Sequence, residues 1–445
     1  MTEEDSGRAL SGESGGPGGT GERAVPEAGA PRSGDSAGGE RALPEAGALS
    51  GEDGVGGERA LPEAGAPSGE DGAGGEKAFS REDGGSGVTG ERALPEAGAP
   101  SGEDDMGGEK ALPREELPGL DLEVLAGYLG RGPLSGELVS GGRSNLTYLV
   151  CDERRSWIVR RPPLGHVLAT AHDMAREYRV MKALSPTDVP VPETYELCED
   201  PEVLGAPFYV MQNVVGHVYR TSAAAAELGL PRLTALAGEL AEVLARLHSV
   251  DPASVGLSEF GRPDGYLERQ LARWSKQLAA SRSRELPGID SLRDRLAAEL
   301  PKSPRAAIVH GDYRLDNVIF GDDDRIAAVV DWEMATLGDP LTDIGALLLY
   351  WDMLVHGQGM FGEVPPGARF PGAEVFIERY AAAGGAELDH LRWYLAFATF
   401  KLAVISEGIH FRFRAGQTVG AGFERIGEAV PVLVERGHAI LTEGV

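Results

Sequence analysis

Hydrophobic residues recur at regular spacings only beyond the first quarter of the chain. Residues 121–129 place a leucine every three to four positions, which predicts a helix. Residues 136–163 alternate short apolar runs with polar, glycine-rich turns, and this pattern predicts three successive strands. A helix is expected over 166–184, with one apolar face formed by Val167, Ala171, Met174, Tyr178 and Met181. Short strands at 189–197 and 206–215 complete a mostly antiparallel sheet with one helix.

Helical spacing dominates beyond about Gly216. Leucines recur on one face of residues 232–250, and residues 265–278 and 394–413 have the same helical character. Inside this region, strand-like apolar runs flank a polar loop at residues 310–317. The sequence therefore predicts an α+β fold with two lobes, a small β-rich lobe followed by a larger α-rich lobe. Ligands usually bind in the cleft that such a plan creates.

The first 115 residues form an acidic repeat rich in Gly, Ala, Glu and Pro. Glu22, Glu40, Glu58 and Glu76 recur at intervals of 18 residues in "GERALPEAGAP"-like units. A fixed period is also typical of solenoids, but each unit has little more than one Leu or Val to bury. That burial is too small to offset the entropy of ordering, so residues 1–115 are predicted to be disordered. An acidic tether and a docking arm for a basic protein partner both remain open.

The overall charge and the cysteine content exclude several classes of protein. The formal net charge is −28, and both the repeat and the remainder are acidic, which argues against nucleic acid as the partner. No apolar run reaches the roughly 18 residues of a membrane helix, and the acidic N-terminus lacks the pattern of a secretion signal. The 2 cysteines form neither a disulfide framework nor a metal cluster. We therefore expect a cytoplasmic protein that does not bind membranes.

The polar loop in "VHGDYRLDNVIF" carries side chains that suit phosphoryl transfer. Asp312 and Asn317 have the spacing of the kinase pattern H-x-D-x-x-x-x-N. The following predicted hairpin ends in Asp331, so this carboxylate is expected to lie level with Asn317 and to share Mg²⁺ ions with its amide oxygen. Asp312 is then left to act on the hydroxyl of an acceptor. The alternative is a loop in which Asp and Asn only form turns, and it requires all three positions to coincide by chance.

Two further features are candidates for phosphate binding. The glycine-rich turn permits close backbone approach and offers side-chain donors, although an ordinary hairpin turn is an equal alternative; its candidate residues are Gly141, Gly142, Ser144 and Asn145. Arg160 ends the third predicted strand, where kinases usually have a phosphate-binding lysine. Glu177 borders the apolar face of the next helix, so we expect it to pair with Arg160 rather than to be a surface ion. His310 and His248 are expected to be structural rather than catalytic.

Three segments of the sequence resemble a known family. "VHGDYRLDNVIF", "VVDWEMATLGDPLTDIG" and "GGRSNLTYLV" resemble the aminoglycoside phosphotransferase superfamily of kinase-like enzymes. "WIVRRPP" and "LGDPLTDIG" are similar to the subgroup whose domain occurs alone or fused to acyl-CoA dehydrogenases. The resemblance extends from about Leu120 to the C-terminus and does not include the repeat.

The resemblance implies a protein-kinase-like bilobal fold that uses ATP and Mg²⁺, with an N-lobe at 116–214 and a C-lobe at 215–445. It implies that Asp312 is the catalytic base and that Asn317 and Asp331 are metal ligands. Arg160 matches the lysine position only as a substitution, and Glu177 matches the helix glutamate. Asp343 would steady the catalytic loop. The adenine site would be lined, through backbone groups, by Met211, Gln212, Asn213 and Val214.

The acceptor is expected to be a small molecule with a hydroxyl group. Basic residues in the C-terminal helical stretch would repel an aminoglycoside and attract an anion; they are Lys401, His410, Arg412 and Arg414. Because subgroup members are thought to phosphorylate hydroxyacyl-CoA, that compound or a similar anionic metabolite is the first choice. An aminoglycoside or macrolide resistance kinase is one alternative. A nucleotide-binding pseudoenzyme or scaffold is another, while the missing A-P-E-like segment after "DWE" speaks against a protein kinase.

Overall fold

The computed structural model describes residues 117–139, 145–164, 173–303, 305–416 and 423–443. All of them belong to one compact unit, Gly87–Val445. The predicted disordered repeat lies outside the described residues, and so do Gly141, Gly142 and Ser144.

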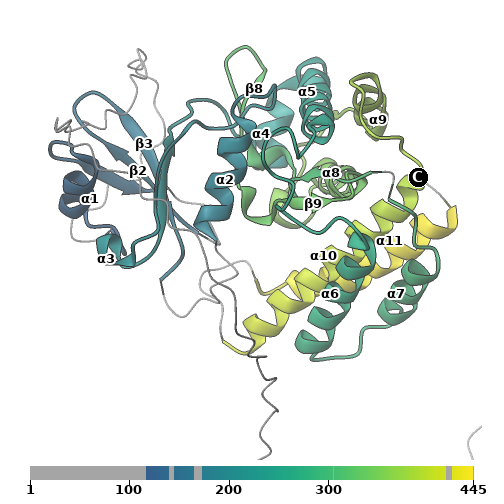
Figure 1. Ribbon diagram of the computed structural model, residues 1–445. Coiled ribbons are helices and arrows are strands. Elements are labelled where there is room, and N and C mark those ends of the chain that lie inside the picture. The colour runs from purple at the N-terminus through teal and green to yellow at the C-terminus, as the bar shows by residue number, and fades with distance from the viewer. Residues whose placement is uncertain (1–116, 140–144, 165–172, 304, 417–422, 444–445) are drawn as a thin grey trace, which may run out of the picture. The chain divides into compact units, whose positions relative to one another are not determined.

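A five-stranded antiparallel sheet forms the first part of this unit (Figure 1). Its strand order is β1 (Ser135–Leu138), β2 (Leu146–Cys151), β3 (Ser156–Arg161), β5 (Phe208–Gln212) and β4 (Thr194–Cys198). Alternate residues point to opposite faces of a strand. One face, with Tyr148, Val150 and Val159, packs against α1 (Leu122–Leu129) and α3 (Pro201–Leu204).

The other face of the sheet packs against α2 (Met174–Leu184), through residues that include Ile158, Tyr209 and Met211. Strand alternation places Arg160 on the same face as Ile158 and therefore towards α2. This face also joins the helical part of the unit, because the hydrophobic core around α2 is continuous with that of the C-terminal helices.

Helix α2 begins later than its hydrophobic pattern predicts. Asp173 has an extended backbone, and its side chain accepts a hydrogen bond from the backbone N–H of Arg176, so it is the N-cap. The helix therefore starts at Met174 rather than near residue 166, and the predicted positions Val167 and Ala171 lie outside the described residues. Glu177 is buried on this helix, in agreement with the expectation that it does not face water.

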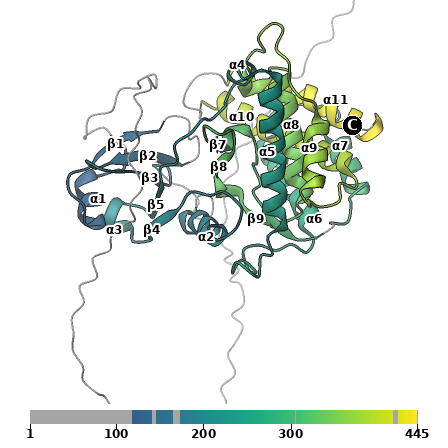
Figure 2. The ribbon, with the colours of Figure 1, turned by 90° about the horizontal axis from the view of Figure 1, so that it is seen from above.

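The remainder of the unit is mostly helical, as predicted. Its helices are α4 (Ser222–Glu227), α5 (Gly229–Ser249), α6 (Tyr266–Ser281), α7 (Ile289–Ala298), α8 (Leu341–Val355), α9 (Ala373–Ala382), α10 (Leu391–Arg414) and α11 (Ala429–Glu443). Helix α10 packs against α6, α8 and α11, and α5 packs against α9 (Figure 2). The larger side chains of α10 that face these helices, such as Trp393 and Phe400, are buried.

Two short two-stranded sheets lie among these helices. Strand β7 (Val318–Phe320) pairs with β8 (Ile326–Val329), as the sequence predicts, and β6 (Ala307–Val309) pairs with β9 (Thr336–Gly338). A short 3₁₀ turn, η2 (Leu315–Asn317), ends the polar loop between β6 and β7. A second, η3 (Trp332–Met334), lies shortly after β8. Turns η4 (Gly359–Phe361) and η5 (Ile426–Glu428) lie farther along the chain. The polar loop thus connects two different small sheets.

The predicted α+β, kinase-like fold class is confirmed: a small antiparallel sheet precedes a larger helical part. The predicted boundary at residue 214 stays a prediction, although the sheet ends at Gln212. The guanidinium of Arg176, on α2, donates to the carbonyl of Ala335 and so joins the two parts. Just after the sheet, the backbones of His217 and Phe320 exchange hydrogen bonds. Among the described residues, no helix combines the length and the apolarity that a bilayer crossing requires.

Candidate active site

One buried carboxylate, that of Asp343, binds the backbone of the polar loop between β6 and β7. Asp343, in the first turn of α8, accepts hydrogen bonds from the backbone N–H groups of His310 (2.7 Å) and Gly311 (2.8 Å). Burial on its own raises the pKa of Asp343, but the hydrogen bond and charge of His248 bring it below the ordinary aspartate value. Asp343 therefore stays ionised and fixes the backbone just before Asp312, as the resemblance implies.

Glycine is required at position 311. Its φ is +84°, in the left-handed region that favours glycine. A β-carbon would lie 2.8 Å from both the carbonyl oxygen and the β-carbon of Met334. The loop can therefore approach η3 this closely only with glycine at the turn.

His310 is a structural residue, as expected. Its side chain is fully buried, Nε2 lies 3.0 Å from the carbonyl oxygen of Val330, and Nδ1 lies 3.3 Å from the backbone N–H of Asp312. Only the neutral tautomer with the proton on Nε2 satisfies both contacts, because the carbonyl must accept and the N–H must donate. The imidazole therefore orients the loop and has no nitrogen left for proton transfer.

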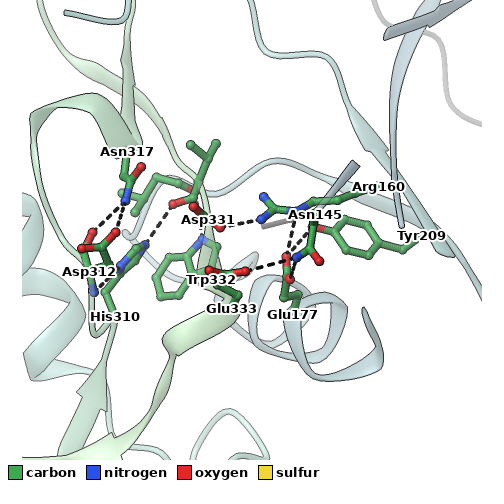
Figure 3. Close-up of polar contacts among 12 residues, drawn as sticks. Asn145, Arg160, Glu177, Tyr209, His310, Asp312, Asn317, Asp331, Trp332 and Glu333 are labelled. Atoms are coloured by element: carbon green, nitrogen blue, oxygen red, sulfur yellow. Dashed lines mark hydrogen bonds and ion pairs between the residues drawn. The ribbon is translucent and has the colours of Figure 1, made fainter. Parts of the chain in front are cut away.

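Asp312 and Asn317 contact each other directly (Figure 3). The amide Nδ2 of Asn317 donates to the backbone carbonyl of Asp312 (2.8 Å) and to its Oδ2 (3.1 Å). Arg314 Nε lies 3.2 Å from the same Oδ2 and 3.3 Å from Asp316 Oδ1. Asp312 is therefore held in one orientation, and the use of Nδ2 leaves the carbonyl oxygen of Asn317 for other ligands.

The β7–β8 hairpin brings Asp331 beside Asn317. Val318 pairs with Val329, and the backbone N–H of Val330 donates to the carbonyl of Asn317 at 3.0 Å. Asp331 itself has φ +67°, a left-handed conformation that Asp tolerates better than most residues. The backbone pairing of the hairpin therefore returns Asp331 to the level of Asn317, as the sequence predicts.

An amide oxygen and a carboxylate are the hard oxygen ligands that Mg²⁺ prefers. Among the described residues, no group of three or more His, Cys, Asp and Glu is arranged to hold a metal. This donor set fits an ion that keeps water and phosphate oxygens in most of its coordination positions, as Mg²⁺ does in kinases.

Arg160 bridges the sheet, α2 and Asp331. Its Nε lies 3.3 Å from Glu177 Oε2 and its NH2 lies 2.5 Å from Asp331 Oδ1, so the two arms of one guanidinium contact two carboxylates (Figure 3). Burial alone lowers the pKa of Arg160, but Tyr209, Glu177 and Asp331 raise it above the ordinary value, so it stays charged. The predicted pair between Arg160 and Glu177 is present in this geometry.

Glu177 is the centre of a buried polar cluster. It is 1% exposed and accepts hydrogen bonds from Tyr209 OH (2.9 Å) and Asn145 Nδ2 (2.9 Å). Burial raises the pKa of Glu177, while Arg160 opposes this effect. Asn145 Nδ2 also lies 3.3 Å from Glu333 Oε2, so this amide joins the sheet to η3. The predicted phosphate contact of Asn145 stays a prediction, because its amide hydrogens here point to carboxylates.

The segment predicted to line the adenine site comprises the last two residues of β5 and the two residues after it. Met211 is buried and pairs with Ile158, and the backbone N–H of Gln212 donates to the carbonyl of Glu193 at 2.8 Å. The side chain of Asn213 donates to Ser156 Oγ at 3.0 Å. Val214 is half-buried. The segment therefore lies at the end of the sheet beside β3, and its adenine contacts stay a prediction.

Comparison with known proteins places this geometry in a family. Residues 135–394 match the phosphotransferase enzyme family (APH). The chain belongs to this family. Acyl-CoA dehydrogenase family member 10 of Mus musculus is 34% identical over 319 residues, and member 11 of Gallus gallus is 36% identical over 314 residues. These matches cover 71% and 69% of this chain but 30% and 40% of the relatives, so the chain spans well under half the length of either.

Solved structures of the phosphotransferase family share the fold. A protein of Ralstonia eutropha JMP134, assigned to the aminoglycoside phosphotransferases, matches with a TM-score of 0.63 and 33% identity, over 72% of this chain and 97% of that one. Macrolide 2′-phosphotransferase type I matches with a TM-score of 0.50 and 19% identity, over 73% of this chain and 98% of that one. The second likeness supports the fold alone.

The basic residues predicted to bind the acceptor occupy different places in this chain. Lys401 Nζ donates to the carbonyl of Gly311 at 3.0 Å, next to Asp312. Arg412 and Arg414 follow on the same helix, roughly 16 and 20 Å farther along its axis at the ordinary helical rise. His410 packs its ring against Gly427. Of these four residues, α10 therefore brings only Lys401 to the loop that carries Asp312.

Sequence reasoning missed several residues of the site. Arg314 contacts Asp312, Tyr209 binds Glu177, and Glu333 binds Asn145. Arg314 could have been found from its place inside "HGDYRLDN", and Tyr209 from its place on the same sheet face as Arg160. No local signal pointed to Glu333, because its partner lies 188 residues away.

Proposed function

We propose that the protein is an ATP- and Mg²⁺-dependent phosphotransferase that moves the γ-phosphoryl group to a hydroxyl of a small molecule. The observation that carries this proposal is the joined constellation of Asp312, Asn317, Asp331 and Arg160. A carboxylate for the acceptor, hard oxygen ligands for a metal and a fixed cation are the parts that phosphoryl transfer requires. Here they are linked by short contacts across two parts of one unit.

Each residue has a role that follows from its contacts. Asn317 and Asp331 would hold Mg²⁺, which neutralises charge on the phosphates when it is bound with ATP. Arg160, held by Glu177, would direct its charge to the phosphate oxygens, as the lysine does in kinases. Asp312 would orient the acceptor hydroxyl and take its proton while the new O–P bond forms and the bond to the leaving ADP breaks.

We propose a hydroxyacyl-CoA, or another anionic metabolite with a hydroxyl group, as the acceptor. Lys401 and Arg314 lie at the Asp312 loop, and a positively charged acceptor would meet repulsion there. The relatives are named as acyl-CoA dehydrogenase family members, which is consistent with a substrate of the acyl-CoA kind. We propose the cytoplasm, where ATP is abundant, as the location of the reaction.

The test is MgATP consumption by the purified full-length chain across four classes of acceptor: hydroxyacyl-CoAs, free hydroxy acids, aminoglycosides and macrolides. Asp312→Asn is the inactive variant. The matched control is Asp389→Asn, which changes an exposed aspartate whose side chain forms no hydrogen bond or ion pair among the described residues. Turnover of a hydroxyacyl-CoA or hydroxy acid, lost only in Asp312→Asn, is expected. Turnover of an antibiotic instead would identify a resistance kinase, and ATP binding without any turnover would favour a pseudoenzyme.

A further inference from the structure

A lysine ammonium group lies beside the loop that carries Asp312, and no carboxylate among the described residues pairs with it. Lys401 is on α10, and its Nζ donates one hydrogen bond, to the carbonyl of Gly311 at 3.0 Å. The ring of Trp274, on α6, lies 5.5 Å from the same nitrogen. Within the described residues, these are the hydrogen bond and ring contact of the ammonium group, and it forms no ion pair. An ammonium group has three donors, so this arrangement leaves two of them for a ligand.

The position is an unfavourable one for a cation in the free protein. Burial lowers the pKa of Lys401, and the nearby charges of Arg273 and Arg314 lower it further, against the attraction of Asp312 and Asp343. Lys401 is half-buried, and a partly desolvated charge with no ion-pair partner among the described residues costs free energy. Such costs are concentrated at functional sites. A neutral residue of the same length, such as methionine, would pack against Trp274 without this cost. The charge therefore needs an explanation beyond the packing of α10.

We propose that Lys401 is a specificity-determining residue that binds a carboxylate or thioester carbonyl oxygen of the acceptor, close to the hydroxyl group served by Asp312. The inference rests on the proposed phosphotransferase function and adds a chemical requirement to it: the acceptor carries this oxygen near its reacting hydroxyl.

The surrounding charges support this requirement. Arg314 Nε contacts Asp312 itself, and Arg273 lies close enough to act on the charge of Lys401. Arg273 and Arg314 thus add positive charge near Lys401, while Asp312 and Asp343 supply the negative charge. Asp343 is already bonded to the loop backbone. A polycationic acceptor would be repelled here, whereas a carboxylate or a polarised carbonyl oxygen would fill the spare donors of Lys401.

Two matched pairs of probes test the requirement in the full-length chain. The first pair is 3-hydroxybutyrate and 1,3-butanediol, which differ in the carboxylate. The second is 3-hydroxybutyryl-CoA and S-(3-hydroxybutyl)-CoA, which differ in the thioester carbonyl. Binding of each probe is measured by calorimetry, and turnover with MgATP is measured alongside. The variants are Lys401→Met, Lys401→Arg and the control Arg392→Met, which changes an exposed arginine near the start of the same helix.

The expected result is a loss in Lys401→Met that depends on the probe. The affinity for the oxygen-bearing member of at least one pair should fall about 10- to 100-fold, the effect of one charge-assisted hydrogen bond, while its partner and MgATP bind as in the wild type. Lys401→Arg should keep part of this preference, and Arg392→Met should keep all of it. Which pair responds identifies the source of the oxygen.

Two outcomes contradict the inference. In one, the wild type binds both members of each pair equally, or binds neither. In the other, Lys401→Met lowers kcat by the same factor for every acceptor and leaves KM unchanged, which would mean that Lys401 only supports the Gly311 carbonyl. Failure of the proposed function is distinguishable, because a chain without turnover that still shows the Lys401-dependent preference in calorimetry keeps the binding site and loses only the reaction.

Discussion

Replacing Arg160 by methionine tests how far the buried charge cluster stabilises the fold. The variant keeps the length of the aliphatic chain but removes the guanidinium that contacts both Glu177 and Asp331. Glu177 is 1% exposed and would keep only neutral donors, from Tyr209 and Asn145. Asp331 is partly exposed, so water can replace its lost contact.

Removing one partner of a buried pair costs about 3–5 kcal/mol, and we expect the lower end because one of the two carboxylates is hydrated. The free energy of unfolding, measured by urea titration at pH 7, should therefore fall by about 3 kcal/mol. Arg282→Met is the matched control, because Arg282 pairs with Asp290 at the surface, and its loss should cost less than about 1 kcal/mol.

The effect should depend on pH in a defined direction. Burial raises the pKa of Glu177, and Arg160 opposes this rise, so the pKa in Arg160→Met is higher than in the wild type. A carboxyl whose pKa is raised in the folded state contributes most stability below its unfolded pKa and loses it as the pH rises through the folded pKa. The difference between wild type and variant should therefore be larger at about pH 7 than at about pH 5.

A double-mutant cycle with Glu177→Gln separates the pair from other effects. The double variant should recover part of the stability lost in Arg160→Met, since no buried carboxylate remains without a cation. A loss below about 1 kcal/mol in Arg160→Met, or no recovery in the double variant, would refute the reasoning.

Three further predictions concern the loop and the metal ligands. Gly311→Ala should destabilise the protein by about 2 kcal/mol more than Gly384→Ala in thermal unfolding: both glycines have positive φ, but only the first would place its β-carbon against Met334. Equal losses would contradict this. The lowered pKa of Asp343 adds stability at pH values above the usual aspartate pKa, and this stability is lost as the pH falls. Asp343→Asn should therefore weaken the pH dependence of the free energy of unfolding below about pH 5. An unchanged pH dependence in this range would contradict the prediction. Asp331→Asn should raise the Mg²⁺ concentration needed for half-maximal turnover about 10-fold without changing the acceptor KM, and an unchanged Mg²⁺ requirement would exclude Asp331 as a ligand.

The residues whose positions were predictable from sequence lie close together along the chain or on regular elements. Asp312 and Asn317 share one loop, and the β7–β8 hairpin returns Asp331 to them through local backbone pairing. Arg160 and Glu177 were predicted as a pair because Arg160 ends the third predicted strand and helical spacing places Glu177 beside the apolar face of the next helix.

Other features depend on packing that local patterns do not contain. The pairing of β6 with β9 and the contact of Asn145 with Glu333 join distant segments. The start of α2 at Met174 was missed because the hydrophobic pattern alone does not show where a helix begins. The side chain of Asp173 caps the first turn and so sets the start of α2. The basic residues of α10 were predicted as one group, but helical rise carries Arg412 and Arg414 away from Lys401 along the axis.

The most direct test of the account compares MgATP binding and phosphoryl transfer in the wild type and in Asp312→Asn. The account predicts that calorimetric affinity for MgATP changes less than about three-fold, while turnover with the best acceptor falls by about 10²-fold or more, because Asp312 acts on the acceptor hydroxyl. A variant that loses ATP affinity and turnover by the same factor, or that keeps its turnover, would contradict the assignment of Asp312 as the catalytic base.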